Sequence, residues 1–130
     1  MFTDSLNHIV LTVSNLERAH KFYNELLELK TEFYKEHNVF CITLSDMSIW
    51  VCTHEQVNPD DCFSEFRVGL DHLSFNAPDR EALDALAMKL KEAGVETNGV
   101  EIFEPSGDFY IAFRDPDNIQ LEYWLDNDEG

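Results

Sequence analysis

Two stretches of the chain begin alike, LNHIVLTV at residues 6–13 and LDHLSFN at residues 70–76, and they lie 64 positions apart. In both stretches apolar and polar residues alternate, which is the pattern of a β-strand with one buried face. His8 and His72 open the alternating runs at equivalent positions, on the more polar face of each predicted strand. The sequence therefore predicts a module that is written twice, with a histidine at the start of each copy.

A helix is predicted after each of these strands, because apolar residues recur there at helical spacing. When the two copies are aligned with the 64-residue offset, Phe22 aligns with Leu86, so the two apolar stripes occupy equivalent positions. Ser14 and Glu17 have the spacing of a capping box, which predicts where the first helix starts. Gly94 predicts where the second helix ends.

About three further strands are predicted after each helix, separated by turn residues. We therefore expect an α+β protein whose unit is a strand, a helix and three strands, repeated once. The expected organisation is one domain of 130 residues, with a first module over 1–57 and a second over 58–130, joined by a linker over 54–69. The predicted later strands cover 31–34, 39–44 and 48–53 in the first copy, and 95–103, 108–113 and 119–124 in the second.

The composition excludes several classes of partner. The formal net charge is −17, which argues against binding to nucleic acid or to an anionic membrane, since both are polyanions. The acidic residues are spread along the chain, so a solvated surface is favoured over an acidic groove for a cationic ligand. Three cysteines without a C-x-x-C pair fit a reducing compartment. No stretch is long and apolar enough to span a bilayer, and we expect a soluble, cytoplasmic protein.

Glu122 is the third residue that carries chemistry. It lies in the apolar strand-like run IQLEYW at 119–124, where a carboxylate is costly to bury unless it is paired or binds a metal. Together with His8 and His72 it would form the two-histidine, one-carboxylate set of open iron, manganese, nickel or zinc sites. Taken singly, such a histidine is more often structural and such a glutamate more often faces water at a sheet edge, so the residues alone leave the metal site open.

Three segments resemble signatures of one superfamily. The segment LNHIVLTVSNLERAHKFYNELLEL, at 6–29, is similar to the N-terminal signature of the glyoxalase I, fosfomycin-resistance and extradiol dioxygenase families. The segment RDPDNIQLEYW, at 114–124, resembles their D-P-D-G-x-x-x-E motif, and LDHLSF, at 70–75, matches their second-module histidine. The chain is thus identified as a member of the vicinal oxygen chelate superfamily.

That resemblance implies a fold and a metal site. The fold would be two paired βαβββ modules forming an incomplete barrel. His8, His72 and Glu122 would hold a divalent metal, Mn, Fe, Ni or Zn, and Glu122 would also move a proton in catalysis. Many short members are homodimers, which implies a site shared between subunits, with His8 of one meeting His72 and Glu122 of the other.

The chain departs from these relatives at several positions. Glyoxalase I supplies a fourth ligand, a glutamate, from the last strand of the first module. Here the position falls on Val51, or on Trp50 or Cys52 after a one-residue slip, so we expect three protein ligands.

The fosfomycin enzymes and the dioxygenases are matched only in part. The fosfomycin enzymes have a threonine where this chain has Val10, and the dioxygenases have a tyrosine where it has Ala112 and a glycine where it has Asn118. The residues expected to bind substrate are Trp50, Arg114 and Thr12.

The function expected from these features is a divalent-metal-dependent enzyme of the glyoxalase or metallothiol-transferase type, acting as a lyase, isomerase or transferase. Its small substrate would be chelated through vicinal oxygens and activated by the metal as a Lewis acid. One alternative is an iron-dependent extradiol-type dioxygenase. Another is a metal-free binding protein for a cationic ligand, similar to bleomycin-resistance proteins.

Overall fold

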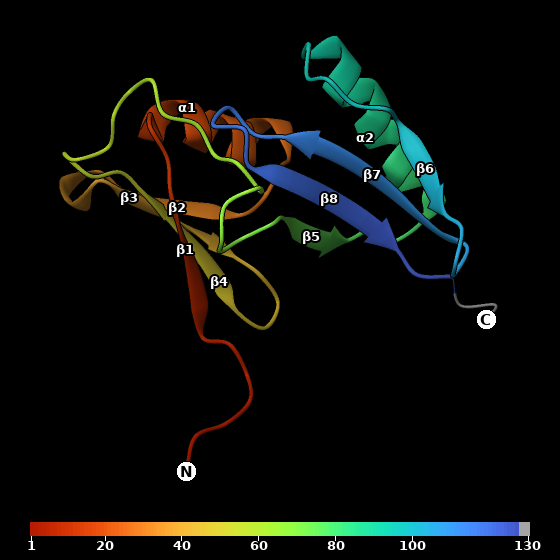
Figure 1. Ribbon diagram of the computed structural model, residues 1–130, viewed down its shortest axis with the longest axis horizontal. Coiled ribbons are helices and arrows are strands. Elements are labelled where there is room, and N and C mark those ends of the chain that lie inside the picture. Colours follow the sequence, from red (N-terminus) through yellow and green to blue (C-terminus); the bar gives the residue numbers. More distant parts are fainter. Residues whose placement is uncertain (128–130) are drawn as a thin grey trace. The chain divides into compact units, whose positions relative to one another are not determined.

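The computed structural model describes residues 1–127, and the chain divides into two compact units, 1–62 and 63–130, each of which is considered by itself. Both units have the order strand, helix, three strands (Figure 1). The predicted α+β class and the repeated βαβββ module are confirmed. No helix in the described part of the chain is long and apolar enough to cross a membrane.

The first unit is a four-stranded sheet in the order β1-β4-β3-β2. Strands β1 and β4 are parallel, and the remaining pairs are antiparallel. A parallel pair needs a long crossover, which the helical segment after β1 begins. The elements are β1 (His8–Thr12), α1 (Leu16–His20), the π-helix η1 (Lys21–Leu26), β2 (Thr31–Tyr34), the 3-10 helix η2 (Lys35–His37), β3 (Val39–Thr43) and β4 (Ser48–Cys52).

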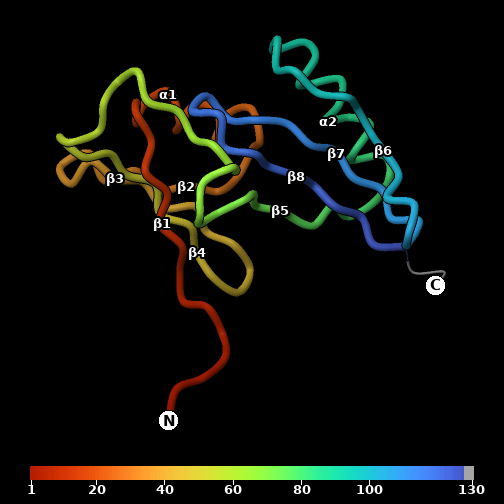
Figure 2. The backbone as a smooth tube through the Cα atoms, viewed as in Figure 1, coloured from red at the N-terminus to blue at the C-terminus, as the bar shows by residue number. Residues whose placement is uncertain are grey.

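The second unit repeats this topology with the order β5-β8-β7-β6. Strands β5 and β8, which are far apart in the sequence, run side by side in parallel (Figure 2). The longer helix α2 packs on β6 and β7. The elements are β5 (Leu73–Asn76), α2 (Arg80–Glu92), β6 (Val100–Phe103), β7 (Asp108–Arg114) and β8 (Gln120–Leu125).

Each sheet buries one face and leaves the other more open, as the alternation predicts. On β8, for example, Leu121 is buried in the core while Gln120 on the other face is half-buried. His8 and Glu122 both lie on the faces opposite the apolar cores, where His8 is exposed and Glu122 is buried. The buried core consists of Leu11, Val13, Leu16, Ala19, Phe22, Tyr23, Leu27, Phe40, Cys41, Ile42, Ile49 and Val51 in the first unit, and Leu83, Leu90, Ile111, Phe113, Ile119 and Leu121 in the second.

The first helix differs from the prediction. Its cap is Asn15 and not Ser14, because the Asn15 side chain accepts a hydrogen bond from the Arg18 backbone N–H at 2.9 Å. After five residues the α-helix widens into the π-helix, where the Leu27 N–H donates to the Phe22 carbonyl at 3.0 Å. Phe22 and Tyr23 are both buried, as their spacing of three and four residues from the buried Ala19 predicts for a helix.

Candidate metal centre

His72 and Glu122 come together in the second unit. The parallel pairing of β5 with β8 sets Ser74 opposite Glu122, which brings the residue just before β5 toward the same carboxylate. The Nε2 atom of His72 lies 3.2 Å from Oε1 of Glu122. Glu122 is buried with 8% of its surface exposed, while His72 remains more open to solvent. A buried carboxylate and an accessible imidazole therefore converge at one end of the strand pair.

The preceding residue fixes the ring of each histidine. Nδ1 of His72 lies 2.6 Å from Oδ1 of Asp71, and Nδ1 of His8 lies 2.6 Å from Oδ1 of Asn7. When Nδ1–H donates to these oxygens, Nε2 is the nitrogen left for other partners. The hydrogen bond to Asp71 is the main cause that raises the pKa of His72; partial burial opposes it, and the Glu122 charge adds to it.

The geometry of the His72 and Glu122 pair fits two neighbouring metal ligands. Ligand atoms that each lie about 2.1 Å from a divalent ion, at an angle near 100°, are about 3.2 Å apart. In metal sites, a ligating histidine usually donates its second ring N–H to a carboxylate or another acceptor, and the contact of His72 with Asp71 fits this arrangement. Over residues 1–127, no group of three or more His, Cys, Asp or Glu side chains is placed to hold an ion. The participation of His8 stays a prediction.

The turn before β8 sets the position of Glu122. Asp115 is buried, and its Oδ1 accepts hydrogen bonds from the backbone N–H groups of Asp117 and Ile119, each at 2.9 Å. Asn118 has a φ of 71°, in the left-handed region that glycine and asparagine tolerate best. The asparagine at the family's glycine position is therefore compatible with the turn. Sequence reasoning missed the structural role of Asp115.

The equivalent of Glu122 in the first unit is Trp50. On the first sheet Val10 pairs with Trp50, and on the second Ser74 pairs with Glu122. Because Val10 and Ser74 are related by the 64-residue repeat, Trp50 occupies the position of the second-unit carboxylate. Its indole Nε1 lies 3.1 Å from the Ser48 hydroxyl, to which it donates. The register thus selects Trp50 among the three positions that the sequence left open.

Trp50 and Thr12 both lie on the same face of the first sheet as His8. The ring of Trp50 is stacked on Tyr34, with centroids 5.8 Å apart. Thr12 is exposed and pairs with Cys52 at the end of β1. This face offers an aromatic surface and hydroxyl groups beside His8, and the two residues remain predicted substrate contacts.

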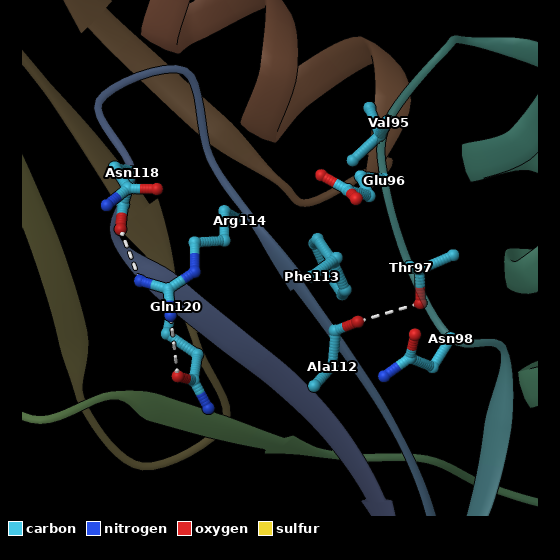
Figure 3. A pocket seen from close by; sticks show the side chains of 9 residues that line it. All are labelled: Val95, Glu96, Thr97, Asn98, Ala112, Phe113, Arg114, Asn118 and Gln120. Atoms are coloured by element: carbon cyan, nitrogen blue, oxygen red, sulfur yellow. Dashed lines mark hydrogen bonds between the residues drawn. The ribbon is translucent and has the colours of Figure 1, made fainter.

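Arg114 is already bound by acceptors of its own unit. Its guanidinium donates to both carboxylate oxygens of Glu65, at 3.2 and 2.5 Å, and also to the Asn118 carbonyl at 3.1 Å and to Gln120 Oε1 at 3.3 Å. Arg114 lines a cavity of about 420 Å³, with Asn118 and Gln120 beside it and Glu96 across from it (Figure 3). The sequence did not reveal Glu65, which is 49 residues away and has no pattern that marks it.

An aromatic pair flanks Glu122 on the same face. Tyr110 and Trp124 are stacked with centroids 5.0 Å apart, and the Trp124 indole N–H donates to Asp108 at 2.8 Å. Trp124 is two residues beyond Glu122 on β8, so the rings lie about 7 Å along the strand from the carboxylate. The alternation of β7 could have identified Tyr110, because it occupies the same face as Ala112, the cross-strand partner of Glu122.

Comparisons with known proteins agree with this fold. The model of the Glyoxalase/Bleomycin resistance protein/Dioxygenase superfamily matches residues 5–123, and the chain belongs to that superfamily. The assignment to the vicinal oxygen chelate superfamily is thereby confirmed.

Individual relatives span most of the chain. The Metallothiol transferase FosB of Shouchella clausii is 29% identical over 130 residues, covering 92% of this chain and 78% of the relative. The Glutathione transferase FosA of Serratia marcescens is 31% identical, covering 91% and 78%. The crystal structure of a glyoxylase/bleomycin resistance protein/dioxygenase domain from Frankia sp. EAN1pec has a TM-score of 0.84 and 31% identity, and covers 99% of this chain and 96% of that one.

Proposed function

We propose that the chain is a divalent-metal-dependent enzyme of the glyoxalase or metallothiol-transferase type, in which His8, His72 and Glu122 bind the metal. The observation that carries this proposal is the 3.2 Å approach of His72 Nε2 to the buried Glu122 carboxylate. An isolated buried carboxylate is costly, and a metal held jointly with an imidazole offsets that cost. The superfamily membership, with two relatives named as transferases, supports the same conclusion.

Each group of the proposed site would have a distinct chemical role. A bound divalent ion, Mn, Fe, Ni or Zn, would supply a Lewis acid for two neighbouring oxygens of a small substrate. Asp71 holds the His72 ring so that Nε2 faces Glu122. Glu122, on a largely buried strand position, would accept or return a proton on its carboxylate. We further propose that Trp50 and Thr12 contact the substrate from the first unit.

The reaction branch can be tested with matched substrates. We expect metal-dependent turnover either of the hemithioacetal of methylglyoxal and a thiol that carries no negative charge or of an uncharged epoxide with such a thiol, and loss of that turnover after chelation. The measurement is product formation by the metal-loaded protein before and after EDTA treatment. Ring cleavage of a catechol with iron(II), seen as a yellow product, would instead move the chain to the dioxygenase branch.

We infer that the working form is a homodimer in which His8 of one subunit meets His72 and Glu122 of the other. Two tagged variants, His8→Ala and His72→Ala, would be co-expressed and the mixed dimer isolated through both tags. We expect it to hold about half the metal of the wild-type dimer, because one of its two sites is then intact. Each variant alone should hold almost none. A mixed dimer as empty as its parents would contradict the shared site.

A further inference from the structure

The open face of the second sheet carries the charges that a substrate at Glu122 would meet. We call it the Glu122 face and define it by alternating residues of four strands. Contacts across the strands place these side chains together, among them the Arg114 to Gln120 hydrogen bond and the stacking of Tyr110 on Trp124. The face consists of Ser74 and Asn76 on β5, Glu101 and Phe103 on β6, Asp108, Tyr110, Ala112 and Arg114 on β7, and Gln120, Glu122 and Trp124 on β8.

Arg114 is the single cationic side chain among these residues, all of which the structure describes. Its charge is cancelled by Glu65, whose two carboxylate oxygens lie 3.2 and 2.5 Å from the guanidinium nitrogens. The Glu65 side chain is only 14% exposed, so water competes weakly for the pair. The hydrogen bond with Arg114 is the main cause that lowers the pKa of Glu65, and the same bond chiefly raises that of Arg114. Both groups therefore stay charged at neutral pH.

Glu65 is held in place by the turn that precedes β8. The Phe63 N–H donates to the Asp117 carbonyl at 2.8 Å, and the Asn118 side-chain amide donates to the Phe63 carbonyl at 2.9 Å. These bonds fix the backbone two residues before Glu65 against the same turn that positions the β8 strand. The carboxylate is thus built into the unit and is not a loose surface group that happens to reach Arg114.

Apart from His72 and the proposed metal ion, the remaining charges near the site are negative. Glu101, Asp108 and Glu122 lie on the Glu122 face, and Glu96 lines the adjoining cavity. A negative group on a substrate would be repelled by these carboxylates and would find Arg114 already paired. The net charge of −17 adds a repulsion of the same sign.

Arg114 is close enough to the proposed metal ligands to interact with a substrate bound there. The row of Arg114 and Gln120 is two residues along the strands from the row of Ala112 and Glu122, a distance of about 7 Å. Ala112, the cross-strand partner of Glu122, has a small side chain and lines the cavity with Arg114 and Gln120, so a substrate chelated beside Glu122 would extend over Ala112 toward Arg114.

We propose that the site takes an uncharged or cationic substrate, and that Glu65 determines this by neutralising Arg114. Phosphates, phosphonates and carboxylates are disfavoured because the one guanidinium that would bind them is occupied. The inference rests on the proposed function, since it requires the substrate to sit beside His72 and Glu122. It adds the substrate class and a specificity-determining residue that does not itself bind the metal.

The experiment uses zinc-loaded protein and three catechols that offer the same pair of oxygens but differ in charge. The probes are 3,4-dihydroxybenzylamine, 4-methylcatechol and 3,4-dihydroxybenzenesulfonate, with affinities measured by titration calorimetry. Comparing each probe between wild type and Glu65→Gln cancels the intrinsic differences in zinc affinity between the probes. We expect Glu65→Gln to bind the sulfonate about tenfold more tightly and the benzylamine several-fold more weakly, with 4-methylcatechol unchanged.

Two further variants separate the charge effect from a structural one. Glu81→Gln makes the same change in net charge on the exposed first turn of α2, and should leave all three affinities unchanged. The double variant Glu65→Gln, Arg114→Gln should return the sulfonate affinity to near the wild-type value. The inference would be overturned if wild type and Glu65→Gln bound the sulfonate with equal affinity. The proposed metal site would still stand in that case, provided that 4-methylcatechol binds only to the zinc-loaded protein. If wild type holds no zinc, the proposed metal site and this inference both fail.

Discussion

Replacing Glu122 by glutamine is expected to lower the affinity for a divalent metal by at least about 100-fold. The amide has nearly the same size but no charge, so the metal loses an anionic ligand while the packing of β8 is kept. Loss of an outer-shell partner already costs 10–100-fold in metal affinity, and a direct ligand should cost no less. The measurement is the dissociation constant of Zn²⁺ by competition with a chromophoric chelator.

The same substitution should barely change folding stability. The buried carboxylate already pays a desolvation cost that its partner only partly offsets, and His72 can still be solvated because it is partly open. We expect the free energy of unfolding of metal-free protein to change by about 1 kcal/mol or less. Wild-type zinc affinity in Glu122→Gln would show that this carboxylate is not a ligand.

Replacing Leu121 by alanine is expected to have the opposite effects, lowering the free energy of unfolding while leaving zinc binding unchanged. Leu121 is the neighbour of Glu122 on β8 but points to the other face, where none of it is exposed and it pairs with Leu73 and Phe113. A leucine-to-alanine change at such a position costs about 2–5 kcal/mol, because it loses buried apolar surface and leaves a cavity. Urea unfolding followed by circular dichroism measures this loss as a lower midpoint.

The matched control for this variant is Leu6→Ala, since Leu6 is 64% exposed and should cost less than about 0.5 kcal/mol. Under conditions where Leu121→Ala is folded, its zinc stoichiometry should equal that of wild type. A loss of zinc binding together with stability would mean that the two faces of β8 are not independent. If Glu122→Gln loses zinc affinity and the adjacent Leu121→Ala loses stability, the apolar face of β8 stabilises the fold and its polar face forms the metal site.

Much of the fold could be predicted because the signals are local. Alternation over five or six residues marked the strands, and the 64-residue repeat related His8 to His72. The π-helical turn could not be predicted, since apolar spacing indicates a helix but does not distinguish its backbone hydrogen-bond pattern from that of an α-helix. The cap at Asn15 was missed by one residue, because Ser14 and Asn15 are both good capping residues.

The site was predicted less completely because it depends on register and on distant contacts. A slip of one residue separates Trp50 from Val51 as the counterpart of Glu122, and only strand pairing distinguishes them. The pairing of Arg114 with Glu65 joins residues 49 positions apart, which no periodicity encodes. Sequence therefore pointed to Arg114 as a candidate for binding substrate, whereas the structure adds its partner, Glu65.

Trp50 occupies the first-unit position that is equivalent to Glu122, so the first unit has no carboxylate there. This affects how many protein ligands a metal in the proposed site would have. With an indole at that position, the first unit offers His8 as its expected ligand and an aromatic surface beside it. Three protein ligands leave several coordination positions for water and for the oxygens of a substrate. Together with the neutralised Arg114, this supports our proposal of a metal site with open positions and a preference for substrates that carry no negative charge.

The most direct test of the central claim is the metal content of the purified protein. Wild type, the double variant His8→Ala, His72→Ala and the control His37→Ala would be stripped, reloaded with Zn²⁺ or Mn²⁺, desalted and analysed by mass spectrometry for metal per chain. His37 is an exposed histidine of η2, so its loss matches the chemistry without touching the site. We predict about one ion per chain in wild type and His37→Ala and almost none in the double variant. Equal metal content in all three proteins would contradict the account.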